Sequence, residues 1–578
     1  MSSKEGELYH QLFLAYKGSN AALPAQLCQK DANAIWKTAK EKLKNKGKFI
    51  EHINDVIREL KVKATKEKAK MLSHFTQPPL PPPQWTDTFE AVNKFIFCIQ
   101  PGLLSVAQED CLVANVYVPE TEERNLPVMV IVHGGAFQHL FGAIQEPNSM
   151  IEYSNMVVVS FNYRLGAHGF LCLGTEEVPG NAGMKDQVAL LKWVQENIGY
   201  FGGNPNDVTI HGCSAGGMSV DFLSLSPIAD GLFHKIIASS GANTGPLGVQ
   251  MDPLENAKIY AKALGFDRVD DIDALEEFYK TASYETLVSQ LDVIVKRSDS
   301  SVLFAACVEA DHGSERFLED APFNYLRKRN LTRYPMLYGY ADLEGLIQME
   351  NFDEYKTMMN DNFLDFLPAD LQFDTDAQRK EIAEKIKNFY FGNDDVSASN
   401  IMGFIDFYTD VIFAYPMLRT VRMHSNFGNN PVYLYEYNFA DNNTAFVLNT
   451  TERGANHCDQ TKALFDENDS DNNFTEEYLQ NKKFVTELFS NFVKLGVPVP
   501  PGSSLPAWLP ANAQRSPHMS IGTTLQIQGP LNQRRAQFWD AIYDQHYKLP
   551  VPPKPSDAPQ LMISVSLVMM TWLINLMS

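Results

Sequence analysis

The chain has 578 residues, of which 44% are hydrophobic and 21% charged, as is usual for a globular protein with a large buried core. Its formal net charge of -21 argues against nucleic acid or an anionic membrane as a partner for the bulk of the chain, and favours a neutral or cationic small molecule. The seven cysteines are too few for a disulfide scaffold, and none forms a pattern with metal-ligand spacing, so we expect no structural zinc.

The first 76 residues differ from the rest because Lys and Arg outnumber Asp and Glu there. Apolar residues recur at helical spacing between residues 35 and 60, which predicts two amphipathic helices. The basic run 61–70 is more typical of a solvated helix face than of a nucleic-acid site. We therefore assign residues 1–76 to an atypical basic helical segment, followed by a stiff Pro-rich connector at 78–83. No apolar stretch follows Met1, so no signal peptide is recognisable.

Beyond the connector, apolar runs that predict strands alternate with helical patterns. Strands are predicted at 128–132, 156–160, 208–210, 235–239, 335–340 and 433–437, and a helix with one apolar side at 186–201. This alternation predicts a mostly parallel α/β sheet with functional groups at the carboxyl ends of its strands. The long stretches 245–330 and 345–430 are predicted to be helical insertions that form a gorge over this edge.

Two glycine-rich turns follow predicted strands. In Gly212-Cys213-Ser214-Ala215-Gly216, a serine stands between glycines on a strand-to-helix turn, which strains its backbone and exposes its hydroxyl. The Ala215 amide points the same way, at the start of a helix whose dipole favours an anion. The second turn, His133-Gly134-Gly135, lets consecutive amides point at one oxygen. Alone, the first pattern also fits an ordinary glycine turn; together, the two predict a nucleophile with an oxyanion hole.

Four further motifs make a resemblance specific, at residues 109–119, 162–166, 180–187 and 201–205. With the two turns, they resemble the cholinesterase/carboxylesterase family of α/β-hydrolases, in its insect-type carboxylesterase branch, over roughly 81–548. The resemblance implies an α/β-hydrolase domain at 77–548 that hydrolyses small carboxylic esters through an acyl-enzyme. It implies no metal and no organic cofactor.

Carried over position by position, the family's triad falls on Ser214, Glu344 and His457, and its oxyanion donors on the amides of Gly134, Gly135 and Ala215. Glu344 follows a predicted strand and precedes a glycine, as the family's acid does. Asp342 is the competing carboxylate. His457 lies in a G-x-x-H-x-x-D pattern after the strand at 433–437.

The resemblance also implies a disulfide between Cys98 and Cys111, which would stabilise the fold by about 3 kcal/mol in the chain-entropy model. We interpret Cys213 and Cys458, which flank catalytic positions, as small packing residues. No aromatic residue lies between Cys98 and Cys111, where cholinesterases have a tryptophan that holds a quaternary ammonium, so choline esters are disfavoured. Juvenile-hormone esterases typically carry Gln at the position of Cys213, which disfavours that substrate too.

Other features depart from the family pattern. The basic segment stands where the family has a β-hairpin, and His74 replaces the arginine expected to pair with Glu109, so a buried Glu109 would cost about 3 to 5 kcal/mol. A non-catalytic adhesion or binding protein is therefore the alternative function, although such relatives usually lose the serine or the histidine. A chain without a stable fold is a third alternative, which a cooperative thermal transition would argue against.

The localisation signals conflict. N-x-S/T sequons stand at Asn330, Asn442, Asn449, Asn468 and Asn473. They favour a secretory route, as does the resemblance, which implies a secreted, extracellular or membrane-anchored protein. A Pro-rich linker at 549–560 precedes an uncharged tail at 561–578, which as a helix would span about 27 Å. This tail could be a lipid-anchor signal, a retained membrane segment or neither, and the sequence does not decide among the three. It does not give the oligomeric state either.

Overall fold

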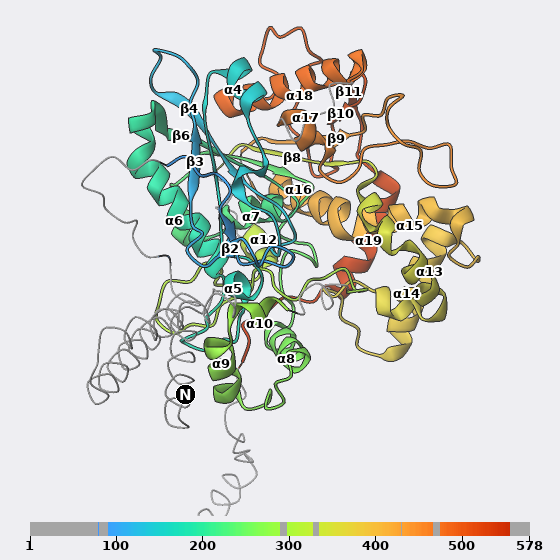
Figure 1. Ribbon diagram of the computed structural model, residues 1–578. Coiled ribbons are helices and arrows are strands. Elements are labelled where there is room, and N and C mark those ends of the chain that lie inside the picture. The colour runs from blue at the N-terminus through green and yellow to red at the C-terminus, as the bar shows by residue number, and fades with distance from the viewer. Residues whose placement is uncertain are drawn as a thin grey trace, which may run out of the picture. The chain divides into compact units, whose positions relative to one another are not determined.

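The computed structural model describes residue 79 and residues 91–289, 297–327, 334–428, 430–465 and 474–554 (Figure 1). The predictions for residues 1–76, for Asn330, Asn468 and Asn473, and for the tail 561–578 fall outside these residues. The chain divides into two compact units, Met1–Gln77 with Glu277–Ser283, and Pro78–Glu276 with Tyr284–Ser578. All candidate site residues belong to the second unit.

A nine-stranded sheet forms the centre of the second unit, in the order β11-β10-β9-β8-β7-β6-β4-β5-β3 (Figure 1). Its strands are β3 (Ala114–Tyr117), β4 (Leu126–Val132), β5 (Val157–Phe161), β6 (Gly203–Cys213), β7 (Lys235–Ser239), β8 (Met336–Ala341), β9 (Val432–Tyr437), β10 (His518–Ile521) and β11 (Leu525–Gln528). Strands β4 to β10 pair with one another in parallel, whereas the edge strands β3 and β11 pair antiparallel. The predicted mostly parallel α/β sheet is confirmed.

The central strands are buried because helices pack against the sheet. Residues 128–132 of β4 and 157–159 of β5 are at most 1% exposed, as their β-branched sequences predict for strands covered on both faces. Helix α7 contacts β6 and β7, α16 contacts β8 and β9, and α18 contacts β4, β6 and β10. The carboxyl ends of the strands are therefore supported by a densely packed sheet and its covering helices.

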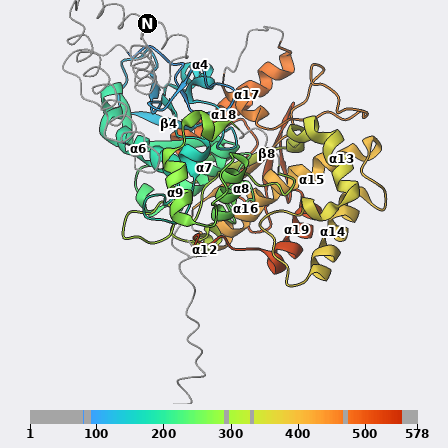
Figure 2. The same cartoon turned by 60° about the horizontal axis from the view of Figure 1, so that its bottom comes forward.

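The helices of the second unit include both predicted insertions. Their bounds are α4 (Asn148–Ser154), α5 (Gly166–Phe170), α6 (Ala182–Asn197), α7 (Ala215–Leu223), α8 (Pro253–Ala263), α10 (Tyr284–Val288), α12 (Pro322–Arg327), α13 (Phe352–Asp361), α14 (Asp376–Phe391), α15 (Ile401–Tyr408), α16 (Tyr415–Phe427), α17 (Asp459–Leu464), α18 (Glu476–Leu495) and α19 (Gln533–His546). Helix α9 spans Ile272–Thr281. Figures 1 and 2 both show α13, α14 and α15 gathered with α19. The helical insertions at 245–330 and 345–430 are confirmed, and α6 begins earlier than predicted.

One helical run among the described residues, Ala398–Phe427, is long and apolar enough to cross a bilayer, with a hydropathy of 1.3. It comprises α15, the π-helical segment η7 (Thr409–Ala414) and α16. Because 83% of its apolar window is buried inside the protein, packing accounts for its hydropathy.

The expected cost of burying Glu109 does not arise. Glu109 is only partly buried in the loop beside β2 (Ala107–Gln108), which pairs with β1 (Phe97–Cys98). A partly hydrated carboxylate avoids most of the penalty of a dry, unpaired charge.

Candidate active site

The turn at Ser214 joins β6 to α7 in a strained backbone conformation. Ser214 has φ 61° and ψ −130°, and its amide donates to Ser239 O at 3.0 Å. A Cβ atom on Gly212 would lie 2.2 Å from the Gly216 carbonyl carbon, and one on Gly216 would lie 2.1 Å from Val132 O. Only glycine fits at these two positions. Ser214 is half-buried between fully buried neighbours, so the turn presents its side chain at the carboxyl edge of the sheet.

The glycine turn after β4 lies directly beside this serine. A Cβ atom on Gly134 would lie 3.1 Å from Ser214 Cβ, and Gly135 adopts φ 93°. Within the part of the chain that the structure describes, the amides of Gly134, Gly135 and Ala215 donate to no protein acceptor. Ala215 is also the first residue of α7, where helix amides lack an internal partner. Three backbone donors are thus available at the turn.

His133 contacts the glycine turn and is itself held by Tyr163. Its Nδ1 lies 3.0 Å from Gly134 O, and its ring stacks on Tyr163 with 4.3 Å between ring centroids. The Tyr163 hydroxyl donates to His133 O at 2.9 Å. Burial lowers the pKa of His133 to about 4, so the ring is neutral at pH 7.

Glu344 and His457 form a buried acid–imidazole pair. Glu344, the first residue of the 3-10 helix η4 (Glu344–Asn351), has a fully buried side chain whose Oε2 bonds His457 Nδ1. Its Oε1 accepts from the Ala341 amide at 2.8 Å. The His457 side chain is 8% exposed. Because Nδ1 is held by the carboxylate, Nε2 is the nitrogen left to take a proton from a nucleophile.

Asp342 contacts the backbone before His457, and it does not contact the imidazole ring. Its Oδ1 accepts from the Ala455 amide at 2.8 Å, and desolvation raises the pKa of Asp342 to about 7. The structure therefore places Glu344 against the imidazole and Asp342 against the backbone that carries it. Of the two competing carboxylates, only Glu344 touches the ring.

The π-helical segment η7 supports both halves of this pair. The Phe413 ring packs on the His457 imidazole, with 4.3 Å between centroids and 32° between planes. The Thr409 hydroxyl accepts from the amide of Gly345, next to Glu344, at 2.9 Å. π-Helical turns are rare and frequently occur at functional sites. Neither Phe413 nor Thr409 was predicted from the sequence.

Cys213 and Cys458 form a disulfide, so their interpretation as separate packing residues is wrong. Their Cα atoms lie 6.1 Å apart. Because consecutive Cα atoms are about 3.8 Å apart, the Cα atoms of Ser214 and His457 are within about 14 Å of each other. Among the described residues, the Ser214 hydroxyl makes no hydrogen bond. The two cysteines are 245 positions apart, but each adjoins a predicted triad residue, and that adjacency was the signal available in the sequence.

Two further disulfides join cysteines that flank no candidate catalytic residue. One joins Cys98 to Cys111, and the other joins Cys172 to Cys307 across 135 positions. The second pair was not predicted. Cys28 lies outside the described residues.

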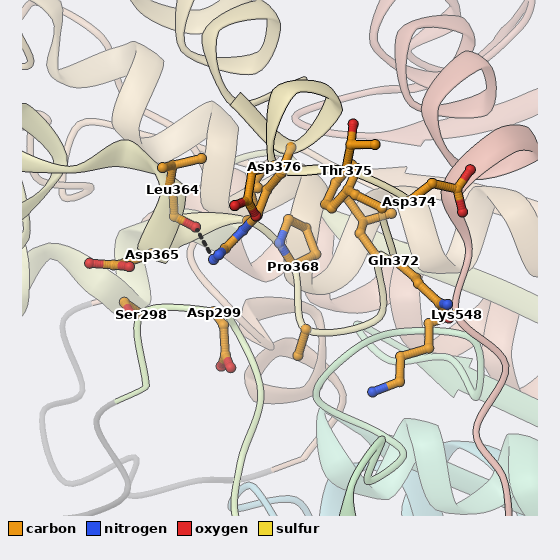
Figure 3. A pocket seen from close by; sticks show the side chains of 15 residues that line it. Ser298, Asp299, Leu364, Asp365, Pro368, Gln372, Asp374, Thr375, Asp376 and Lys548 are labelled. Carbon is orange, nitrogen blue, oxygen red and sulfur yellow. Dashed lines mark hydrogen bonds between the residues drawn. The ribbon is translucent and has the colours of Figure 1, made fainter. Parts of the chain in front are cut away.

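Figure 3 shows an open polar hollow of about 990 Å³. It is lined by Ser298, Asp299, Leu364, Asp365, Leu367, Pro368, Ala369, Leu371, Gln372, Phe373, Asp374, Thr375, Asp376, Arg379 and Lys548. Arg379 donates to the Leu364 carbonyl at 3.3 Å, so this cation already has a partner. None of the candidate catalytic residues lines the hollow.

Surface and metal features complete the description. Of the sequons, Asn442 and Asn449 are described, and both are exposed. No group of three or more His, Cys, Asp or Glu side chains within the described ranges could hold a metal ion.

Comparison with known proteins shows which family the chain resembles. The model of the carboxylesterase family matches residues 74–539. Venom carboxylesterase-6 of Apis mellifera is 31% identical over 496 residues, covering 82% of this chain and 88% of that protein. Juvenile hormone esterase of Heliothis virescens is 30% identical over 465 residues, covering 75% and 80%. The crystal structure of juvenile hormone esterase from Manduca sexta, with OTFP covalently attached, superposes with a TM-score of 0.72 at 27% identity, covering 82% of this chain and 92% of that chain.

The family match spans most of the chain, and the relatives are named esterases. The resemblance seen in the sequence motifs is therefore confirmed. The chain belongs to the carboxylesterase family and is a carboxylic ester hydrolase.

Proposed function

We propose that this protein is a serine carboxylesterase that uses Ser214 as nucleophile, His457 as general base and Glu344 as orienting acid. The observation that carries the proposal is the Cys213–Cys458 link, which keeps the strained serine turn close to the Glu344-bound histidine. The neighbouring donors at Gly134, Gly135 and Ala215 support an oxyanion hole.

In this mechanism, Glu344 holds the proton on His457 Nδ1, so that Nε2 accepts the proton of the Ser214 hydroxyl. The serine oxygen attacks the ester carbonyl, and the three amides bind the negative oxygen of the tetrahedral intermediate. Each such donor typically contributes about 10² to 10³ in rate. His457 then protonates the departing alcohol, and water, activated by the same imidazole, releases the acid from Ser214.

The proposed substrates are small, uncharged carboxylic esters. The segment Ile99–Asp110, between the cysteines of the first disulfide, carries no aromatic ring that could hold a quaternary ammonium. We therefore propose that choline esters are poor substrates. Comparing kcat/KM for butyrylcholine with that for a neutral butyrate ester of similar size would test this, and a preference for the choline ester would contradict it.

Steady-state hydrolysis of p-nitrophenyl acetate tests the nucleophile. Ser214→Ala should lower kcat by at least about 10⁴-fold, because the proposed acyl-enzyme forms on this hydroxyl. Its cooperative thermal transition should remain, because the substitution removes one half-buried hydroxyl. Wild-type protein without turnover, or Ser214→Ala with wild-type turnover, would contradict the proposal and revive a non-catalytic binding role.

A further inference from the structure

We propose that the Cys213–Cys458 disulfide is a positioning element of the catalytic site, and that ester turnover depends on it. The bond joins the residue before the proposed nucleophile to the residue after the proposed base. The inference deepens the proposed serine mechanism and rests on it.

The segment 455–458, called the histidine loop here, is fixed by contacts with residues that follow β8 and with η7. Glu344 bonds the imidazole, Asp342 accepts from the Ala455 amide, and Phe413 packs on the ring. Asp342 and Glu344 follow directly after β8, and Phe413 belongs to η7. These contacts orient His457 toward Glu344 but leave its distance to Ser214 undetermined.

The Cys213–Cys458 disulfide connects the histidine loop covalently to the strand that precedes Ser214. Cys213 is the last residue of β6, and Cys458 immediately precedes α17. Gln460, fully buried on α17, adds a weaker link, because its amide donates to Ser240 Oγ at 2.7 Å and lies 4.0 Å from Cys213 Sγ. Without the disulfide, this amide and the packing of Phe465, at the end of α17, on His211 of β6 would remain, and neither is a covalent tie to the turn.

Both ends of the link lie beside strained backbone. Ser214 has φ 61°, and Cys458 itself has φ 62°. Non-glycine residues keep such conformations only where the surroundings over-determine them. A bond between the two turns supplies that constraint and limits the drift of His457 away from Ser214.

The oxidised state also matters for the chemistry of the base. Cys458 Sγ lies 3.6 Å from His457 Nε2, the nitrogen that must accept the serine proton. A half-cystine has no proton to donate, whereas a free thiol has one, and a thiol beside imidazole readily forms a thiolate–imidazolium pair. The disulfide therefore keeps Nε2 available as a base.

The test compares two double variants with the wild type. Cys213→Ala/Cys458→Ala removes the active-site bond, and alanine avoids placing a new donor beside Nε2. Cys172→Ala/Cys307→Ala is the matched control, because it removes another buried disulfide that spans 135 positions and flanks no triad residue. The readouts are kcat and KM for p-nitrophenyl acetate, the rate of labelling by a fluorophosphonate, and the thermal unfolding midpoint.

The active-site variant should lose about 10- to 100-fold in kcat and in labelling rate, with KM nearly unchanged, because the misplacement affects proton transfer and not binding. The control should keep its kcat even where its unfolding midpoint falls. Equal kcat in the folded active-site variant and the wild type would overturn the proposal, as would an equal loss in the control. Wild-type turnover that does not require Ser214 would instead overturn the proposed function.

Two further measurements guard against a variant that fails to fold. The single variant Cys213→Ala, which leaves the Cys458 thiol beside Nε2, should turn over more slowly than the double variant, and a faster rate would contradict the role of the thiol. In the wild type, a dithiol can pass two electrons and two protons to the cystine and become a disulfide itself. Activity should fall as mass spectrometry shows Cys213–Cys458 opening and return on reoxidation; full activity with this bond open would overturn the proposal.

Discussion

Asp342 and Glu344 stand two positions apart and contact the same histidine loop, but only Glu344 meets the imidazole. The sequence favoured Glu344 as the acid because a glycine follows it, and Glu344 is the carboxylate that contacts the imidazole. It could not show what Asp342 does instead, because its partner is a backbone amide that lies 113 positions further along the chain. Roles of this kind depend on the tertiary fold.

Glu344→Gln should lower kcat by about 10³- to 10⁴-fold, because an amide cannot stabilise the imidazolium and favours the wrong tautomer. Asp342→Asn, the matched control, keeps an oxygen for the Ala455 amide and should lose less than about tenfold. Steady-state kinetics on both folded variants decides between the carboxylates. A larger loss in Asp342→Asn would assign the acid to Asp342.

Asp342 also predicts a pH dependence of stability. Desolvation raises its pKa from 3.8 to about 7, so the folded state binds this proton more tightly than the unfolded state. The corresponding stability is complete below pH 3.8 and is lost as the pH rises through 7. Asp342→Asn should therefore gain stability relative to the wild type between pH 4 and pH 8, by at most a few kcal/mol. Urea unfolding at both pH values measures the difference, and a constant difference would contradict this account.

Among the elements, η7 shows where sequence patterns lose information. The insertion at 345–430 was predicted to be helical, and it is. Its π-turn was not predicted, because a change in helical winding follows from tertiary contacts, here the Thr409–Gly345 bond and the Phe413–His457 packing.

Phe413→Leu should lower kcat about tenfold, because the imidazole loses the flat surface that fixes its orientation. Phe404→Leu in α15 is the matched control: it removes an equally buried ring, which packs on Phe352 and Tyr408. Both variants should lose about 1 to 3 kcal/mol of unfolding free energy. Kinetics and denaturant unfolding together test this, and equal kcat in the two variants would remove Phe413 from the site.

Some strands of the sheet were predicted from the sequence and others were not. Buried central strands such as β4 and β5 were predicted because every residue in a strand covered on both faces can be apolar. The short strands β3, β10 and β11 were missed: β3 has no fully buried residue, and β11 has one. Such sequences carry no apolar run, and neighbouring strands determine their pairing.

For the whole molecule, the number of cysteines limited how many disulfides could form but did not show which cysteines pair. Pairings across 135 and 245 positions follow from the way the sheet brings distant loops together, and spacing alone cannot reveal them. The family resemblance supplied only the short Cys98–Cys111 loop.

The three disulfides predict the thiol content of the chain, since they use all cysteines except Cys28. Titration with Ellman's reagent in denaturant should find at most one thiol per chain before reduction and seven after it. Three or more thiols before reduction would show that at least one of these bonds is absent.

The central claim is that one strained serine, paired with one histidine, carries the chemistry. The most direct measurement is mass spectrometry of the protein after reaction with a fluorophosphonate. We predict one adduct per chain, on the peptide that contains Ser214, and its loss in both Ser214→Ala and His457→Ala. An adduct elsewhere, or unchanged labelling in either variant, would contradict the account.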